Sequence, residues 1–263
     1  MKRFALLYAA VTVSLATVTA QLNTPRASAL GQAAVAARDV WGAGQNPAAV
    51  PGSEARPFAV QAYGRTLTTV DALTQVGIDA RYRLNNASVG VGVQHFSPPG
   101  YAQTALHASV QRVLAKDLTA GLRLGVVLGD YDEYGSETLP VVQLGVQYRV
   151  SGKLRAGAHY TYAERPILPL AEHRLRIGID YASSERVHLL LAAIQPVDNR
   201  LAAGFGVVFR ASDRFRLNAG VQTGGTAFTF GLEAALRNGL GLALTAVAYQ
   251  ELPLSVDYGI SYE

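Results

Sequence analysis

Residues 172–182 read EHRLRIGIDYA, and this stretch decides the fold class. Large apolar side chains alternate along it with charged or small ones: Leu175, Ile177, Ile179 and Tyr181 against Arg174, Arg176, Gly178 and Asp180. A period of two places alternate side chains on opposite faces of a β-strand. Residues 143–150 and 256–262 repeat the pattern. Each of these strands therefore has one face suited to lipid and one face suited to water.

Turn signals divide the chain from residue 57 to its end into fourteen candidate strands. They cover 57–67, 72–84, 87–96, 102–114, 118–129, 139–150, 153–163, 172–182, 186–195, 200–211, 214–223, 227–237, 239–250 and 254–263. Connections after even-numbered strands are short, such as Asn85-Asn86 and Asn238-Gly239, whereas those after odd-numbered strands are longer and richer in proline. The longest is an acidic loop expected at 130–138. Short periplasmic turns that alternate with longer outside loops are typical of outer-membrane barrels. The sequence predicts an all-β protein: a 14-stranded antiparallel transmembrane β-barrel over residues 57–263.

Residues 1–20 have the pattern of a cleaved signal peptide. Lys2 and Arg3 precede an apolar run at 4–18, and positions 18–20 supply the small residues that cleavage requires. The remaining chain has no apolar stretch near the roughly 20 residues that a transmembrane helix needs. Only a closed barrel then satisfies every backbone group in lipid. We expect export to the bacterial outer membrane, with outer-membrane lipid as a partner.

The composition excludes several other classes of protein. The chain is 49% hydrophobic and 16% charged and has no cysteine, which excludes a disordered or disulfide-stapled chain. The net charge is +4, but the basic residues are scattered singly, so we expect no nucleic-acid partner. Hydrolase and phosphate-loop motifs do not occur, and the histidines lack metal-ligand spacing. We therefore expect no enzymatic activity, no cofactor and no metal site.

Five aromatic residues share the apolar register near the turn-side ends of even-numbered strands: Tyr82, Tyr148, Tyr181, Phe209 and Tyr262. Tyrosine favours the boundary between lipid and water, so these residues predict a periplasmic aromatic girdle. Alternation alone leaves open a lipocalin-like barrel with an apolar interior, and the aromatic placement favours the lipid-facing interpretation. The general preference of aromatic residues for strands is the other explanation.

The opposite register combines glycines with charges. The residues predicted to line the lumen are Asp79, Arg81, Arg123, Arg149, Arg155, Arg174, Arg176, Asp180, Arg216, Glu233 and Asp257. A barrel of about fourteen strands is too wide for its own side chains to fill, so small inward residues leave room for a plug or a pore. Two interpretations of the charges stay open. They pair across the wall as a structural lattice, or the excess of arginine selects anions in an open lumen.

Residues 21–56 are too irregular to continue the series of strands. A short helix is expected over residues 31–39, followed by a turn-rich stretch. We predict that this segment is a periplasmic or luminal plug, and that Asp39, Trp41, Asn46 and Pro47 belong to it.

The stretch AARDVWGAGQNPAAV at 36–50 resembles the N-terminal signature of the long-chain fatty-acid transporter (FadL-like) superfamily. In that signature an alanine-rich segment, an acidic residue, an aromatic residue and an Asn-Pro-Ala element precede the barrel. Ala49 and Val50 depart from the usual glycine and leucine, and the outside loops here are short, so the resemblance is to a small, divergent member.

The resemblance implies a passive channel for small apolar or amphipathic solutes, gated by the N-terminal plug. Hydrophobic small molecules are then the expected ligands. Relatives of the superfamily are also implied as accessory barrels of the type IX secretion system. The alternative function is therefore a non-transporting scaffold that binds an envelope or secretion-system protein, which the short outside loops favour.

Overall fold

The structure is a computed structural model that describes residues 24–37, 41–49, 56–67, 74–97, 100–132, 135–163, 172–196, 201–223, 226–250 and 253–263. The predicted signal peptide at 1–20 and the predicted plug residue Asp39 lie outside the described residues.

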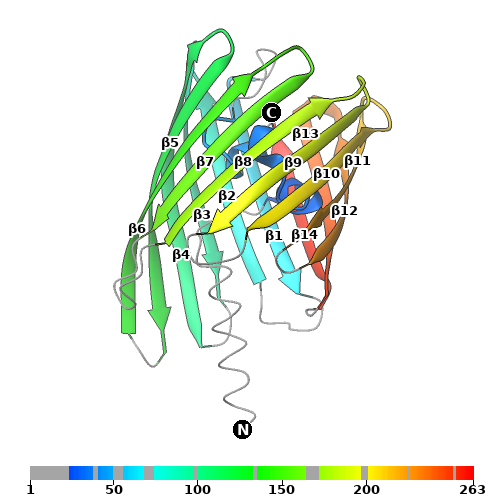
Figure 1. Cartoon of the computed structure of the whole chain (residues 1–263). Coiled ribbons are helices and arrows are strands. Elements are labelled where there is room, and N and C mark those ends of the chain that lie inside the picture. Colours follow the sequence, from blue (N-terminus) through cyan, green and yellow to red (C-terminus); the bar gives the residue numbers. More distant parts are fainter. Residues whose placement is uncertain are drawn as a thin grey trace.

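Fourteen strands close into one barrel, and each strand is antiparallel to both of its neighbours (Figure 1). The strands are β1 (Phe58–Leu67), β2 (Thr74–Arg83), β3 (Ala87–Phe96), β4 (Tyr101–Ala115), β5 (Leu118–Tyr131), β6 (Gly135–Arg149), β7 (Leu154–Ala163), β8 (Glu172–Ala182), β9 (Val187–Pro196), β10 (Ala202–Arg210), β11 (Phe215–Gln222), β12 (Ala227–Ala235), β13 (Leu240–Tyr249) and β14 (Ser255–Tyr262). The predicted fold class is confirmed.

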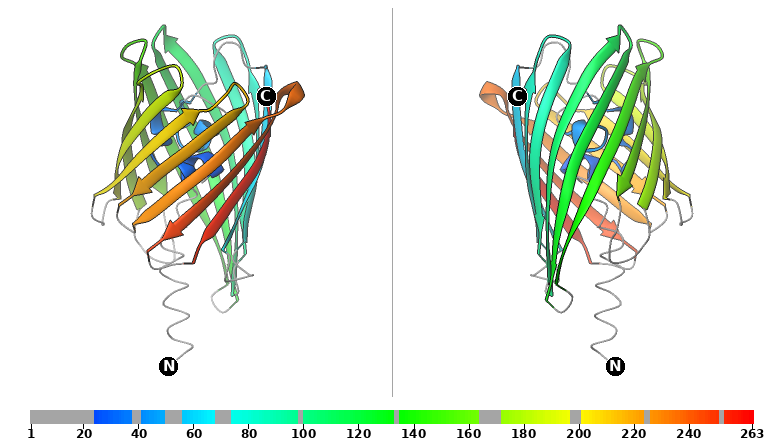
Figure 2. Two further views of the ribbon diagram at one scale, coloured as in Figure 1. Left: turned by 90° about the vertical axis from the view of Figure 1, so that its right-hand side faces the viewer. Right: turned by 90° about the vertical axis from the view of Figure 1, so that its left-hand side faces the viewer.

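The first and last strands meet to close the sheet. β1 pairs with β14 from Val60 opposite Tyr262 to Leu67 opposite Ser255. Closure leaves no open sheet edge. A sheet that spans a bilayer needs this, because unpaired backbone groups at an edge would have no hydrogen-bond partners in lipid. The C-terminus lies at the same end of the barrel as the turns after even-numbered strands (Figure 2). The sequence predicts that this end faces the periplasm.

The two faces of the wall differ as the alternation predicts. Ile78, Ile177 and Leu244 point outward and are each 53% exposed, whereas Arg176 and Asp180 point inward and are buried. The outward face forms an apolar band around the barrel, and such a band is the surface that acyl chains contact in a membrane barrel.

The predicted acidic loop at 130–138 is wrong. β5 continues to Tyr131 and β6 begins at Gly135, so most of this stretch is a hairpin in which Asp130 lies opposite Ser136. Gly135 has a φ of 78°, which glycine adopts without a steric penalty. The Tyr131 hydroxyl donates a hydrogen bond to Glu137 and fastens the two strands. Elsewhere the predicted strand boundaries lie within two residues of those observed.

The helix expected over 31–39 is also wrong. The helical elements before the barrel are α2 (Pro25–Ala29) and two 3₁₀ turns, η1 (Ala34–Ala36) and η2 (Gly42–Gly44); a third, η3 (Arg237–Gly239), forms a hairpin turn. Thr24 caps α2 by accepting a hydrogen bond from the Ala27 amide, and proline is favoured at the first helical position. Positive φ values at Gly31 and Gln32 then end the helix. Among the described residues, no helix is long and apolar enough to cross a membrane.

The apolar core of the molecule lies inside the barrel. We call the described residues 24–37 and 41–49 the N-terminal segment; it lies within the ring of strands in both views of Figure 2. Leu30 and Val35 of this segment pack with Leu190 of β9 and Val208 of β10 in one buried cluster. The barrel is therefore filled at this level by the chain that precedes it.

Candidate functional site: the lumen and its N-terminal segment

Glycines of the wall form the surface on which the N-terminal segment rests. A Cβ added at Gly157 would lie 2.6 Å from the Val35 carbonyl oxygen, and one at Gly206 would lie 2.9 Å from the Leu30 Cβ. A Cβ would likewise lie within 3.0 Å of an atom of the segment at further inward glycines: Gly121, Gly145, Gly204, Gly220, Gly231 and Gly259. No larger residue would let the backbone of the segment approach so closely. The glycine-rich inward register thus accommodates part of the chain itself.

Asn46 makes four side-chain hydrogen bonds within the lumen. Its side chain is fully buried, and Nδ2 donates to the carbonyl oxygens of Val35 at 2.9 Å and of Val146 and Ala158 at 3.3 Å. Its Oδ1 accepts from the Ala48 amide at 2.9 Å. The asparagine therefore joins two parts of the segment to strands β6 and β7.

Polar side chains of the wall satisfy the backbone carbonyls of the segment. Gln147 Nε2 donates to Val35 and Ala37 at 3.0 Å, Thr229 Oγ1 to Ala29 at 2.8 Å, and Thr245 Oγ1 to Pro25 at 2.8 Å. A segment with so little regular structure has few internal partners for these carbonyls, and buried ones must find partners elsewhere. These wall residues are uncharged, which is why a search for charges along the sequence did not single them out.

An ion pair crosses the seam of the barrel and reaches the segment. Arg65 of β1 binds Asp257 of β14 through two hydrogen bonds of 2.7 Å, and its Nη2 also donates to Ser28 Oγ at 2.7 Å. Asp257 is fully buried. Arg65 was missing from the predicted lumen residues, although the parity of β1 places it inward.

Trp41 fixes the segment against the same seam. Its ring is buried in a cluster with Ala59 and Tyr63 of β1 and with Ala243 of β13. A Cβ at Gly259 of β14 would lie 2.9 Å from the ring, so glycine makes room for the indole. The Thr24 hydroxyl donates to the Trp41 carbonyl at 3.2 Å.

Several predicted lumen charges contact the segment, and others pair within the wall. Arg176 donates to Gln45 Oε1 at 2.6 Å, Arg123 contacts the Gly44 carbonyl at 3.5 Å, and Arg81 donates to the Ala49 carbonyl at 3.1 Å. Within the wall, Glu233 pairs with Arg216, Asp180 with His188, and Asp79 with His107. Glu233 also pairs with Arg26 of the segment. These contacts add a third role for the inward charges, besides a structural lattice and anion selection. In this role, arginines bind backbone carbonyl and side-chain amide oxygens of the segment.

The remaining predicted charges lie elsewhere on the inward register. Arg155 lies opposite Asp180 across β7 and β8, and Arg174 lies on β8 one inward position from Arg176. Arg149 is exposed near the turn end and pairs with Asp117 at 3.7 Å. Of the predicted plug residues, Trp41, Asn46 and Pro47 are brought together with the wall; the Pro47 carbonyl packs on Gly121.

The aromatic residues predicted for the girdle all point outward. Tyr82, Tyr148, Tyr181, Phe209 and Tyr262 are exposed and lie near the ends of β2, β6, β8, β10 and β14. The Arg56 guanidinium lies 5.0 Å from the centre of the Tyr262 ring, beside the C-terminus.

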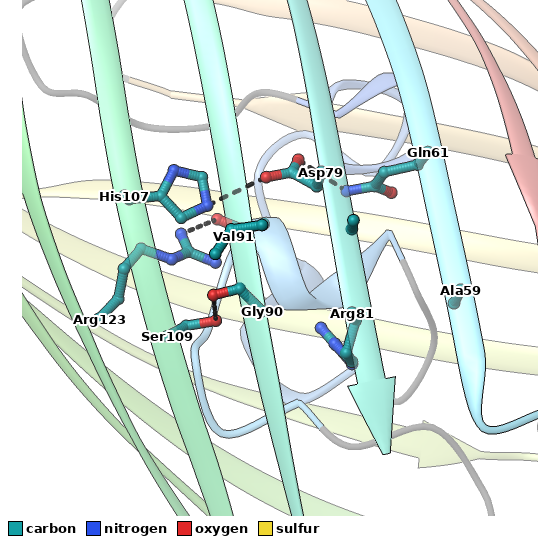
Figure 3. A pocket seen from close by; sticks show the side chains of 11 residues that line it. Ala59, Gln61, Asp79, Arg81, Gly90, Val91, His107, Ser109 and Arg123 are labelled. Carbon is teal, nitrogen blue, oxygen red and sulfur yellow. Dashed lines mark hydrogen bonds and ion pairs between the residues drawn. The ribbon is translucent and has the colours of Figure 1, made fainter.

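Two small cavities flank His107 and Arg123 on the wall formed by β1 to β6. The first, of about 20 Å³, is lined by Gln61, Asp79 and Gly44 of the segment, among others (Figure 3). The second, of about 10 Å³, is lined by polar Gln94 and Gln143 and by apolar Ala105, Val127 and Val141. These three apolar residues belong to a larger inward cluster with Leu139 and Ala163.

The comparisons with known proteins agree on the architecture. No protein-family model matches the chain, and no curated protein is similar to it in sequence. Among solved structures, the CymD monoaromatic hydrocarbon channel superposes with a TM-score of 0.65 at 13% identity, covering 91% of this chain and 96% of that one.

Two further structures are similar. The toluene transporter TodX of Pseudomonas putida has a TM-score of 0.64 at 12% identity and covers 91% of this chain and 97% of its own. A FadL homologue of Pseudomonas aeruginosa has a TM-score of 0.63 at 10% identity, with coverages of 91% and 98%. Because the sequence identities are this low, these comparisons show similarity of fold alone. The chain has the fold of these FadL-like barrels.

Proposed function

We propose that this protein is an outer-membrane channel for small apolar or amphipathic solutes, and that residues 21–56 are a plug that closes its lumen. The observation that carries the proposal is the fit between wall and segment. Inward glycines leave space for the segment, and Gln147, Thr229 and Thr245 bind its carbonyls. A wall that served only to hold its own shape would have no need of this arrangement.

The way the segment is held supports its movement. It forms no strand within the sheet, and the hydrogen bonds that join it to the wall come largely from side chains. The backbone ladder of the barrel can therefore remain closed while the segment moves. The proposed plug consists of the N-terminal segment together with its neighbours at 21–56, including Asp39.

The lining of the lumen supports apolar solutes. Val127, Leu139, Val141 and Ala163 are inward residues that form a buried apolar cluster, which is an unusual lining for an aqueous pore. The similar structures are described as a monoaromatic hydrocarbon channel and a toluene transporter, which favours the same class of solute.

The exterior supports a place in the outer membrane. The apolar band meets lipid, and Tyr82, Tyr148, Tyr181, Phe209 and Tyr262 form the periplasmic girdle at the boundary near the C-terminus. The signal peptide at 1–20 directs export and is removed.

Deletion of residues 31–52 tests the plug. In planar bilayers, the shortened protein should show a higher single-channel conductance than the full chain. Asn46→Asp provides a second test that leaves the length unchanged, because aspartate removes the donors that hold Val35, Val146 and Ala158. Heat-modified mobility on gels checks that each barrel is folded. Folded variants with the conductance of the full chain would remove the plug from the proposal.

A further inference from the structure

Three turns at the predicted periplasmic end share one sequence pattern. Residues 151–154 read SGKL, residues 184–187 read SERV and residues 212–215 read SDRF. Each stretch begins with a serine, has a basic residue two positions later and ends on a large apolar residue. The turns connect β6 to β7, β8 to β9 and β10 to β11, and these six strands are consecutive in the barrel. The pattern therefore repeats along one continuous part of the rim.

The serine fastens each turn in the same way. Ser151 Oγ accepts hydrogen bonds from the amides of Lys153 at 3.3 Å and Leu154 at 3.1 Å. Ser184 and Ser212 accept the equivalent bonds, from the second and third residues after them, at 3.1–3.3 Å. Such a bond from a serine hydroxyl fixes the backbone of a turn. The basic residue in the turn is thus held in a defined backbone position.

The three basic residues also occupy equivalent positions along the rim. In each turn, the carbonyl of the basic residue accepts a hydrogen bond of 2.7–2.8 Å from the last residue of the next even-numbered strand: Lys153 from Ala182, Arg186 from Arg210, and Arg214 from Ala235. Successive turns are two strands apart, so the basic residues recur at intervals of roughly 10 Å. We call Lys153, Arg186 and Arg214 the cation row.

The apolar residue that follows each cation belongs to the outward face of the wall. Leu154 lies opposite Tyr181, and Val187 lies opposite Phe209. Residues directly opposite each other share a face of the sheet, and Tyr181 and Phe209 are exposed on the outward face. Phe215 is itself 49% exposed. The cation row therefore runs along the boundary of the apolar band, beside the predicted aromatic girdle.

The charges of the row are available to an anion. Lys153, Arg186 and Arg214 are exposed, and none of them forms an ion pair or a side-chain hydrogen bond with a residue that the structure describes. Glu185 and Asp213 precede the two arginines in the chain, but within the described part of the molecule they form no ion pair with them.

We propose that the cation row binds the headgroups of anionic phospholipids in the periplasmic leaflet of the membrane. A basic side chain beside a membrane surface attracts anionic lipid about fivefold, which corresponds to about 1 kcal/mol. The fixed turns hold the three cations at the level where the apolar surface ends, and headgroups lie at this level. The inference rests on the proposed place of the barrel in the outer membrane, and it is independent of the plug.

The shape of the row favours lipid over an acidic protein. A stable protein interface buries roughly 800 Å² on each partner. The row is instead a single line of side chains on short turns, and each cation is followed directly by a residue of the outward apolar face. A line of this kind matches the edge of a bilayer, which runs around the barrel at one level.

Native mass spectrometry of the purified full chain in detergent tests the proposal. The protein is titrated with palmitoyl-oleoyl phosphatidylglycerol and with palmitoyl-oleoyl phosphatidylcholine, and the dissociation constants of the first bound lipid are compared. The two lipids have the same acyl chains, so their ratio isolates the net charge of the headgroup. Phosphatidylglycerol should bind at least about fivefold more tightly. Equal binding of the two lipids would overturn the proposal.

Two triple variants separate charge from the turn itself. Lys153→Gln/Arg186→Gln/Arg214→Gln should abolish the preference for phosphatidylglycerol, whereas the matched control Lys153→Arg/Arg186→Lys/Arg214→Lys should retain it. Heat-modified mobility on gels checks that both barrels are folded. A preference that survives in the glutamine variant, or that both variants lose equally, would contradict the assignment to the cation row.

Removal of the neighbouring acids should have the opposite effect. Glu185→Gln/Asp213→Asn should strengthen the preference for phosphatidylglycerol, because it removes two negative charges beside the row, and an unchanged or weaker preference would count against the proposal. Soluble polyglutamate is the last probe. If it binds the wild type and not the glutamine variant while the two lipids bind equally, the row serves an acidic polypeptide and the lipid proposal is overturned. Deletion of residues 31–52 leaves the row in place, so the plug and the lipid site fail separately.

Discussion

The side-chain oxygen of Asn46 occupies the space that a Cβ at Gly145 would need. The same side chain donates hydrogen bonds to the carbonyls of Val35, Val146 and Ala158. A residue near the start of the chain and a glycine a hundred positions later are thus fitted to each other. The close contact makes the wall glycine as necessary to the segment as the asparagine is.

Replacement of Gly145 should displace the segment without opening the barrel. Gly145→Val places a branched side chain where Asn46 lies, so the segment must shift while the outward face is unchanged. We expect higher conductance in planar bilayers and an unchanged heat-modified band on gels. Gly152→Ala in the β6–β7 turn is the control, because a Cβ there meets no atom within 4 Å. Equal conductance of the two variants would argue against the contact.

Loss of the Asn46 donors should destabilise the seating of the segment by about 1–3 kcal/mol, as expected for a buried hydrogen-bonding group that loses its partners. The chain has one tryptophan, and Trp41 is buried in the segment. Its emission therefore reports the segment alone. When the protein is unfolded with urea, the emission of Trp41 shifts to longer wavelength as the residue becomes exposed. The urea concentration at the midpoint of this shift should be lower in Asn46→Asp than in the wild type, and Asn86→Asp, in an exposed turn, should leave it unchanged. Coincident midpoints for all three proteins would count against this role of Asn46.

The ion pair at the seam should matter more than an exposed pair. Arg65 and Asp257 are joined by two hydrogen bonds, and Asp257 is fully buried, so Asp257→Asn should cost roughly 3–5 kcal/mol. Asp117 pairs with Arg149 at 3.7 Å with both side chains partly exposed, so Asp117→Asn should cost about 1 kcal/mol or less. Urea unfolding in detergent compares them. Similar losses in the two variants would contradict the account of the seam.

The lipid-facing surface should tolerate charge only near its edges. Leu244 is outward in the middle of β13, and Leu236 is exposed at the turn after β12. Leu244→Arg should cost about 2–4 kcal/mol in a bilayer, and Leu236→Arg about 0–1 kcal/mol. Unfolding of the two variants in liposomes measures the difference. Equal costs would place the apolar band elsewhere.

The strands and the facing of their residues could be predicted because both depend on local pattern. Alternation fixed which residues point inward, and Arg176 and Asp180 are buried where parity placed them. Turn chemistry fixed the short connections: Asn238 and Gly239 have φ values of 65° and 83°, as an Asn-Gly hairpin turn requires. The hairpin of β5 and β6 was missed because its acidic residues were interpreted as a loop, whereas Asp130 pairs with Ser136 and Glu137 with Gly129 across the two strands.

The partners within the lumen could not be predicted, because they join residues far apart in the chain. Ser28 meets Arg65, and Gln147 meets Val35, through contacts that no local pattern contains. Buried glutamines carry no charge and were passed over, yet Gln147 binds the segment and Gln61 binds Asp79 within the wall. The helix was misplaced because Thr24 and Pro25, which begin it, precede the stretch whose alanines favoured a helix.

A reversible crosslink between the segment and the wall tests the central claim most directly. A Cβ at Gly178 would lie 3.2 Å from the Cβ of Val35, close to the separation of about 3.5–4.5 Å found in disulfides, and the chain has no cysteine of its own. Single-channel conductance of Val35→Cys/Gly178→Cys should fall when the disulfide forms and recover when dithiothreitol reduces it, while neither single variant responds. Conductance that stays the same after the disulfide has been confirmed by mass spectrometry would contradict a plug that must move to open the lumen.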